Sequence, residues 1–242
     1  MRRVAFLAFV VGAFAGSAFA AETTGWKGSI DASLSFVEGN RNTDSVLIIG
    51  KMKQVGTNDR KIVDGLYNFS RQTNNLGNFE TSTDLWSLGG RYERDFGNKS
   101  FWYVSARFDR DGVNDLNLRQ VYGAGLGYTM FANDVSTWRI SVGASQVLED
   151  YQSGNTDYFG LQATSDYTRQ LDAKLSLEHS FLYVPNVDDF EDYFFVSSLG
   201  LSYKLNERMK AGFRWIVNFD ATPSAGSRKQ NRTYAFTLGY SF

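Results

Sequence analysis

The chain has 242 residues and a formal net charge of −1, from 25 Lys and Arg against 26 Asp and Glu. This balance leaves no basic excess for binding nucleic acid, so we expect no nucleic-acid partner. The sequence contains no cysteine, which excludes disulfide bonds and a lipid-anchored cysteine. Aromatic residues make up 16% of the chain, and there are 23 glycines but only 2 prolines, a composition typical of all-β proteins.

Residues 1–20 have the pattern of a secretory signal peptide. Two arginines precede an apolar stretch that ends in the small-residue site Ala18-Phe19-Ala20. We expect cleavage after Ala20, so that residues 21–242 form the mature protein as a single domain. The apolar stretch is too short to span a membrane comfortably as a helix, and no later stretch approaches the ~18 apolar residues that a transmembrane helix requires. Any membrane span must therefore be made of strands.

The rest of the chain alternates between apolar and polar residues, which is the period of a strand with one apolar face. In residues 26–36, for example, the even positions are apolar or small while the odd positions, from Lys27 to Ser35, are polar. The pattern predicts twelve strands, over residues 26–36, 45–55, 62–72, 81–94, 101–110, 119–130, 137–146, 158–169, 173–184, 193–204, 209–220 and 232–242.

Short and long connections alternate between the predicted strands. Longer segments include 149–157, 185–192 and 221–231, and both prolines, Pro185 and Pro223, lie in them, where no ladder hydrogen bond is lost. An even number of antiparallel strands with short turns at one end is typical of bacterial outer-membrane barrels, which have short periplasmic turns and longer extracellular loops. The short turns are predicted at residues 56–60, 95–99, 132–134, 171–173 and 205–208.

The tryptophans indicate which face of the strands meets lipid. All of them lie on the apolar phase, and tyrosines flank that phase near strand ends, as in the aromatic girdles of membrane barrels. We therefore predict a monomeric, antiparallel transmembrane β-barrel of the bacterial outer membrane, in contact with lipid and lipopolysaccharide. A soluble periplasmic ligand-binding barrel, with the apolar phase inside, is the alternative.

The last strand alternates large and small residues from Tyr234 to Phe242. Its outward aromatics Tyr240 and Phe242 resemble the C-terminal signal that the assembly machinery of outer-membrane barrels reads. We expect this machinery to be a partner of the chain.

The polar phase supplies the residues expected to line the lumen. Either they pair into a salt-bridged plug, or they surround a narrow water-filled pore with a mild preference for anions. Twelve strands lie between the filled barrels of eight strands and the open channels of sixteen, so we favour a plugged or very narrow barrel over a general porin. The lumen candidates are Lys27, Asp31, Lys51, Lys53, Arg91, Arg107, Arg119, Asp166, Lys174, Glu178, Lys210 and Arg214.

Enzymatic activity has little support in the sequence. The single histidine, His179, shares the lipid-facing phase, but the next residue on that phase is Phe181, and Ser180 points the other way. We predict no catalytic, cofactor or metal site, and keep a membrane-embedded lipid-modifying hydrolase, with a partner from another strand, as an alternative. The acidic segments 109–115 and 188–192 lack the spacing of an EF-hand and are interpreted as solvated loops.

Three short motifs carry a resemblance to a known family. They are Trp26-Lys27-Gly28, the turn 38–40 with Asn42-Thr43 after it, and the segment 123–128, of sequence GAGLGY. Together they resemble the YdiY-like family, bacterial barrels often labelled salt-induced outer-membrane proteins. The resemblance implies an outer-membrane β-barrel without an assigned activity, so we expect a non-enzymatic structural or envelope-stress role, or the narrow passage of small solutes.

Overall fold

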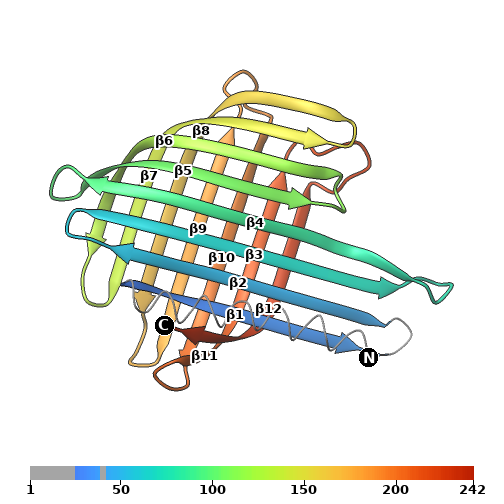
Figure 1. The fold of residues 1–242 in the computed structure, drawn as a ribbon, viewed down its shortest axis with the longest axis horizontal. Helices are drawn as coiled ribbons and strands as arrows, with labels where there is room; N and C mark the ends of the chain where they lie inside the picture. Colours follow the sequence, from blue (N-terminus) through green and yellow to red (C-terminus); the bar gives the residue numbers. More distant parts are fainter. Residues whose placement is uncertain (1–24, 39–41) are drawn as a thin grey trace.

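The computed structural model describes residues 25–38 and 42–242, so the predicted signal peptide lies outside the described residues. These residues form a closed antiparallel barrel in which β1 pairs with both β2 and β12 (Figure 1). The all-β fold class and the strand number are therefore confirmed. The strands are β1 (Trp26–Val37), β2 (Thr43–Val55), β3 (Asp59–Thr73), β4 (Phe79–Asp95), β5 (Ser100–Asp111), β6 (Leu116–Ala132), β7 (Ser136–Tyr151), β8 (Gly154–Gln170), β9 (Leu175–Pro185), β10 (Tyr193–Lys204), β11 (Met209–Asp220) and β12 (Gln230–Ser241).

Closure leaves the sheet without a free edge, as a lipid environment requires. Figure 1 shows β1 to β4 crossing the strands of the opposite wall at a steep angle, which follows from the tilt of strands in a closed barrel. At the seam, Gly28 and Phe242 exchange two backbone hydrogen bonds of 2.9 and 3.0 Å, so the end of the chain is fixed beside β1. Among the described residues, no helix is long and apolar enough to cross a membrane.

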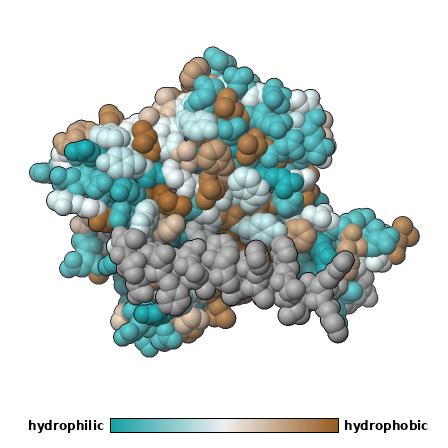
Figure 2. All heavy atoms as spheres, viewed as in Figure 1, coloured by the Kyte–Doolittle hydropathy of each residue, from teal (hydrophilic) through white to brown (hydrophobic). Residues whose placement is uncertain are grey.

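The register places the apolar phase outside, because directly opposed residues of neighbouring strands share a face. On β12, Phe236 is 81% exposed, whereas on β5 the oppositely phased Phe101 and Tyr103 are each 1% exposed. Figure 2 shows hydrophobic side chains across the middle of the visible outer surface, with hydrophilic ones gathered toward its ends. An apolar outside is the arrangement of an outer-membrane barrel, so the soluble-barrel alternative is wrong.

The two ends of the barrel differ as predicted, with one exception. The inner end, defined by residue 242 and the start of β1, carries the short turns 56–58, 96–99, 133–135, 171–174 and 205–208. The outer end carries the longest connections, 186–192 and 221–229. The predicted loop 149–157 is wrong, because β7 continues to Tyr151 and β8 starts at Gly154. Its polar residues looked loop-like, but Glu149 turns inward to an ion pair.

Candidate functional site

One half of the lumen is filled by aromatic rings lying against glycines. Phe101 and Tyr103 of β5 face inward and pack over Gly127 and Gly125 of β6. A Cβ atom on Gly127 would lie 2.1 Å from the Phe101 ring, and one on Gly125 would lie 2.9 Å from Tyr103. Only glycine permits this approach, which gives a physical reason for the glycine repeat in residues 123–128. We call Phe101 and Tyr103, which fill the space inside β5 and β6, the aromatic plug.

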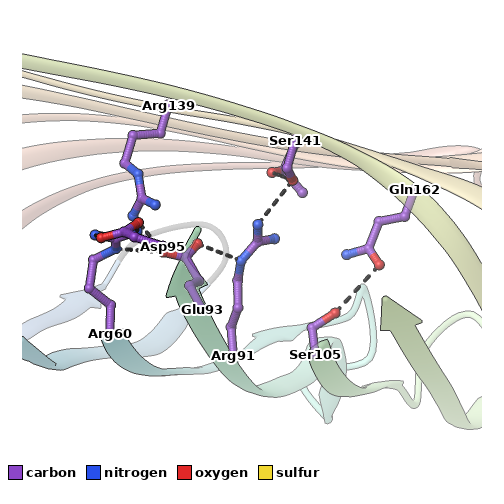
Figure 3. A network of polar contacts seen from close by, with 9 residues as sticks. Arg60, Arg91, Glu93, Asp95, Ser105, Arg139, Ser141 and Gln162 are labelled. Carbon is purple, nitrogen blue, oxygen red and sulfur yellow. Dashed lines mark hydrogen bonds and ion pairs between the residues drawn. The ribbon is translucent and has the colours of Figure 1, made fainter. Parts of the chain in front are cut away.

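A group of charges surrounds Glu93 at the inner end of the plug (Figure 3). The Glu93 carboxylate, with a side chain only 4% exposed, accepts hydrogen bonds from Arg60 at 2.9 Å, Arg91 at 2.8 Å and Arg139 at 2.5 Å. Arg60 also pairs with Asp95 at 2.5 Å. A buried carboxylate of this kind is tolerated because it is fully paired. We call these five residues the Glu93 cluster.

The arginines of the Glu93 cluster also stack on the aromatic plug. The guanidinium of Arg139 lies 4.0 Å from the Phe101 ring centroid, and that of Arg91 lies 3.7 Å from the Tyr103 ring centroid. Such cation–π contacts contribute about 0.5–2 kcal/mol each. Arg91 donates to Ser141 Oγ at 3.0 Å on the facing wall, and Figure 3 shows this contact spanning the lumen. Charges and rings therefore form one packed unit.

A second tie crosses the lumen near its outer end. Arg119 of β6 binds Glu149 on the adjacent strand and Asp220 of β11, which lies across the barrel. Its guanidinium also stacks on Phe194 at 4.2 Å. Because β6 and β11 are five strands apart in the barrel order, this ion pair joins opposite walls rather than neighbours.

The other half of the lumen, formed by β9–β12 and β1–β3, holds charges that differ in how far they are buried. Asp31 of β1 pairs with Lys210 at 3.1 Å and Arg214 at 3.4 Å, and Arg214 continues to Glu178 at 3.3 Å. Asp31 is buried, but the Glu178 side chain is 38% exposed although it faces inward.

Two further inward-facing charges near the middle of this half have exposed surface. Lys51 of β2 is exposed, and Asp64, directly opposite on β3, has a side chain that is 44% exposed. Glu178 lies within electrostatic range of Lys51 across the lumen. Inward-facing charges with exposed surface indicate a hydrated path along this wall. We call Lys51, Asp64 and Glu178 the hydrated charges.

The outer mouth is partly covered by loop 221–229. In this loop, Ser224 Oγ donates to the carbonyl of Asn114 at 3.0 Å, and the Arg228 N–H donates to Asn114 Oδ1 at 3.2 Å. Asn114 lies in the connection between β5 and β6, on the opposite side of the barrel from β11 and β12. The loop must therefore reach across the mouth to make these contacts.

The structure places the predicted lumen candidates on the inward phase of their strands, with one exception. Lys174 lies in turn 171–174, and its ammonium is 5.9 Å from the ring of Tyr203, which faces outward, so Lys174 does not line the lumen. Arg107 pairs with Asp109 at 2.7 Å. Asp166 lies directly opposite Arg139. The inward candidates, by the register, are Lys27, Asp31, Lys51, Lys53, Arg91, Arg107, Arg119, Asp166, Glu178, Lys210 and Arg214.

Several lumen residues were missed by sequence reasoning. The sequence predicts Arg60 in a turn and Glu149 in a loop, although both lie in strands. Arg139 lies on the polar phase of its strand, and this phase is the one feature of the sequence that indicates an inward side chain. Asp220 ends β11 and was also on the polar phase. Arg139 and Asp220 pair with residues of strands that are not their neighbours, which no local pattern reveals.

The outer surface brings His179 next to a serine from the neighbouring strand. His179 Nε2 lies 3.2 Å from Ser197 Oγ, and both residues occupy the outward phase of β9 and β10. The sequence excluded a serine next to His179 on its own strand but left a partner from another strand open. In the described part of the chain, His179 has no carboxylate as a hydrogen-bond partner. Nor do any three metal-ligating side chains gather there to hold an ion.

The chain belongs to the family described as "Protein of unknown function, DUF481", the YdiY-like family, whose profile matches residues 30–242. No curated protein matches the sequence. The NanC porin has a similar structure, with a TM-score of 0.52 and 9% identity over 89% of this chain and 98% of that chain. This likeness shows a shared barrel fold. Two more distant structures are the translocator domain of the autotransporter NalP from Neisseria meningitidis (TM-score 0.48, 13% identity, 100% of this chain and 97% of that chain) and an outer membrane channel from Pseudomonas putida F1 (0.47, 10%, 89% and 94%).

Proposed function

We propose that this outer-membrane barrel passes small solutes through a narrow path in its lumen and catalyses no reaction. The observation that carries the proposal is the exposure of the hydrated charges Lys51, Asp64 and Glu178 on the inward phase. Charges in a barrel without water need close partners, because desolvation of an ion is costly. Lys51 has no ion pair among the described residues, and the Asp64 and Glu178 side chains stay 44% and 38% exposed although they pair with Arg107 and Arg214. This exposure favours a water-filled path.

The packed half of the lumen limits the width of this path. The aromatic plug and the Glu93 cluster occupy the β4–β7 side, so we place the path along the side formed by β9–β12 and β1–β3. Toward the outer end this side narrows as well, because Asn68 donates to Thr233 Oγ1 at 2.9 Å and the inward-facing Leu47 and Ile216 are buried. A path of this kind suits ions and small solutes rather than the wide diffusion of a general porin.

Single-channel conductance in planar bilayers tests the proposal. We expect small discrete current steps from the refolded barrel and, after Lys51→Glu, a shift of the reversal potential toward cation preference. The matched control is Lys61→Glu, because Lys61 lies at the inner end of β3 on the outward phase and changes the net charge equally. Bilayers that stay silent while the barrel is folded, shown by heat-modifiable gel migration, would refute passage and leave a structural or envelope-stress role.

A second candidate function is supported by the pair of His179 and Ser197. A histidine that hydrogen-bonds a serine hydroxyl can act as the base that activates it, and both face lipid. The test is release of fatty acid from phospholipid by the refolded barrel, compared with Ser197→Ala and His179→Ala. Hydrolysis that both variants abolish would establish a lipid hydrolase. Equal background release from all three proteins would reject it.

Partners are a further part of the proposal. We infer that β12 and its outward Tyr240 and Phe242 are read by the outer-membrane assembly machinery, and that the mature barrel works as a monomer among lipid and lipopolysaccharide. Removing Phe242 should reduce the amount of barrel in the outer membrane while leaving refolding in detergent much less affected. Equal losses in both settings would instead indicate a purely structural role at the seam with Gly28.

A further inference from the structure

Two pairs of lysines stand directly opposite each other at the inner end of the barrel. The register pairs Lys27 of β1 with Lys53 of β2, and Lys204 of β10 with Lys210 of β11. All four lysines occupy the inward phase. Like charges in directly opposed positions of a sheet destabilise it. The arrangement therefore works against folding unless something neutralises it.

Among the described residues, one carboxylate, that of Asp31, forms an ion pair with any of these four lysines. Lys210 pairs with Asp31, whereas Lys27, Lys53 and Lys204 are exposed and form no ion pair within the described ranges. Two buried carboxylates toward this end are already occupied. Asp31 also binds Arg214, and Glu93 is surrounded by three arginines. Positive charge is thus left over at this mouth.

The lysines lie close enough to act on one ligand. Their strands follow one another in the order β2, β1, β12, β11 and β10, and β12 between them presents the small residues Gly239 and Ser241 inward. Strands are spaced by about 4.8 Å, and the register sets Lys210, level with Asp31, four residues along the strands from Lys27, so the four backbone positions span roughly 23 Å. Flexible lysine side chains can converge across that distance, and an ammonium is a strong point charge for phosphate or carboxylate groups.

We propose that Lys27, Lys53, Lys204 and Lys210, the lysine quartet, form a binding site for a small anion with two or more charges, of the phosphate or carboxylate type, at the inner mouth. This site extends the proposed function and rests on it for its role, because it concentrates anions at the inner end of the hydrated path. Binding itself requires no conduction, so the two proposals fail separately.

The test uses the full barrel refolded in a neutral detergent, with inorganic pyrophosphate as the probe. Binding is measured by calorimetry and by the temperature at which the folded, fast-migrating form is lost. We expect pyrophosphate to bind and to raise that temperature, and the double variant Lys27→Gln/Lys53→Gln to weaken binding at least tenfold. Lys61→Gln, which removes an exposed outward lysine at the same end, is the matched control and should bind as the parent does.

The direction in which the double variant changes the unfolding temperature distinguishes an anion-binding site from a merely structural role. Without pyrophosphate and at low salt, the double variant should unfold at a higher temperature than the parent, because a repulsive pair is removed. With saturating pyrophosphate, the difference in unfolding temperature between the double variant and the parent should shrink or change sign. A double variant that is less stable in both conditions would overturn the proposal.

Two other results would also overturn it. Equal loss of pyrophosphate binding in Lys61→Gln would show general attraction to surface lysines. Failure of pyrophosphate to bind, together with lysine-dependent binding to vesicles of anionic phospholipid, would assign the quartet to lipid headgroups instead. Binding in silent bilayers would support the site while rejecting passage, and conduction without binding would do the opposite.

Discussion

Replacing Gly127 with alanine should destabilise the barrel, because the added methyl group has no room. An ideal Cβ atom at this position lies 2.1, 2.3 and 2.8 Å from three atoms of the Phe101 ring. The ring cannot easily move away, since it is 1% exposed and Arg139 stacks on it at 4.0 Å. Overpacking of this kind costs about 1–3 kcal/mol of unfolding free energy.

A matched glycine on the same type of strand provides the control. Gly90 of β4 lies on the outward phase, and a Cβ atom there meets nothing within 4 Å. Gly90→Ala should be neutral or slightly stabilising, because alanine loses less backbone freedom on folding, an effect of about 0.4–1 kcal/mol. Urea titration in detergent, followed by tryptophan fluorescence, measures both variants under the same conditions.

A double-mutant cycle then assigns the effect to the contact itself. Phe101→Ala alone should cost about 3–5 kcal/mol, as expected for truncating a buried aromatic side chain. In the double variant the clash is absent, so the combined loss should be smaller than the sum by about 1–3 kcal/mol. Additive losses, or equal stability of Gly127→Ala and Gly90→Ala, would refute the packing of Phe101 against β6.

Three further predictions concern the charges and loops. Glu93→Gln should destabilise the barrel by about 3–5 kcal/mol in the same urea assay, because three arginines lose their shared carboxylate. Asn114→Ala removes the hydrogen bond from the Arg228 N–H to Asn114 Oδ1, so it should loosen loop 221–229 and raise the open probability in single-channel recordings, whereas an unchanged value would show that this contact does not hold the loop over the path. Two backbone N–H groups hold the pKa of the Asp172 carboxyl below its usual value. Stability from this turn is therefore present above pH ~4 and is lost as pH falls through the lowered pKa. Asp172→Asn should remove that part of the acid dependence of unfolding.

The strands and their orientation were predictable because alternation is a local property. The predicted ranges 193–204 and 209–220 coincide with β10 and β11, and most other strands differ only in where they end. The inward phase followed from the same pattern, since it needs only the parity of each residue. The glycine segment 123–128 was recognised as a family feature, but its cause, the contact with Phe101 and Tyr103, was not visible.

Contacts between distant strands could not be predicted from the sequence. The Glu93 cluster joins β3, β4 and β7, and its geometry depends on the shear and closure of the whole barrel. Residues 149–157 show a different limit. Their polar side chains suggest a loop, yet β7 and β8 extend into them and Glu149 pairs with Arg119 of the neighbouring β6. Ser197 likewise lies 18 positions from His179 in sequence, and only strand pairing brings them together.

The unequal halves of the lumen follow from what a barrel of this size must do to stay folded and still admit water. A lumen lined all round by exposed charge would leave the walls joined only by strand pairing, whereas Arg91, through Ser141, and Arg119, through Asp220, add contacts between strands that are not neighbours. Those contacts need paired charges, because an unpaired one would be costly there. Unpaired lysines are therefore confined to the half that water reaches, and the same separation that stabilises the barrel defines the course of the proposed path.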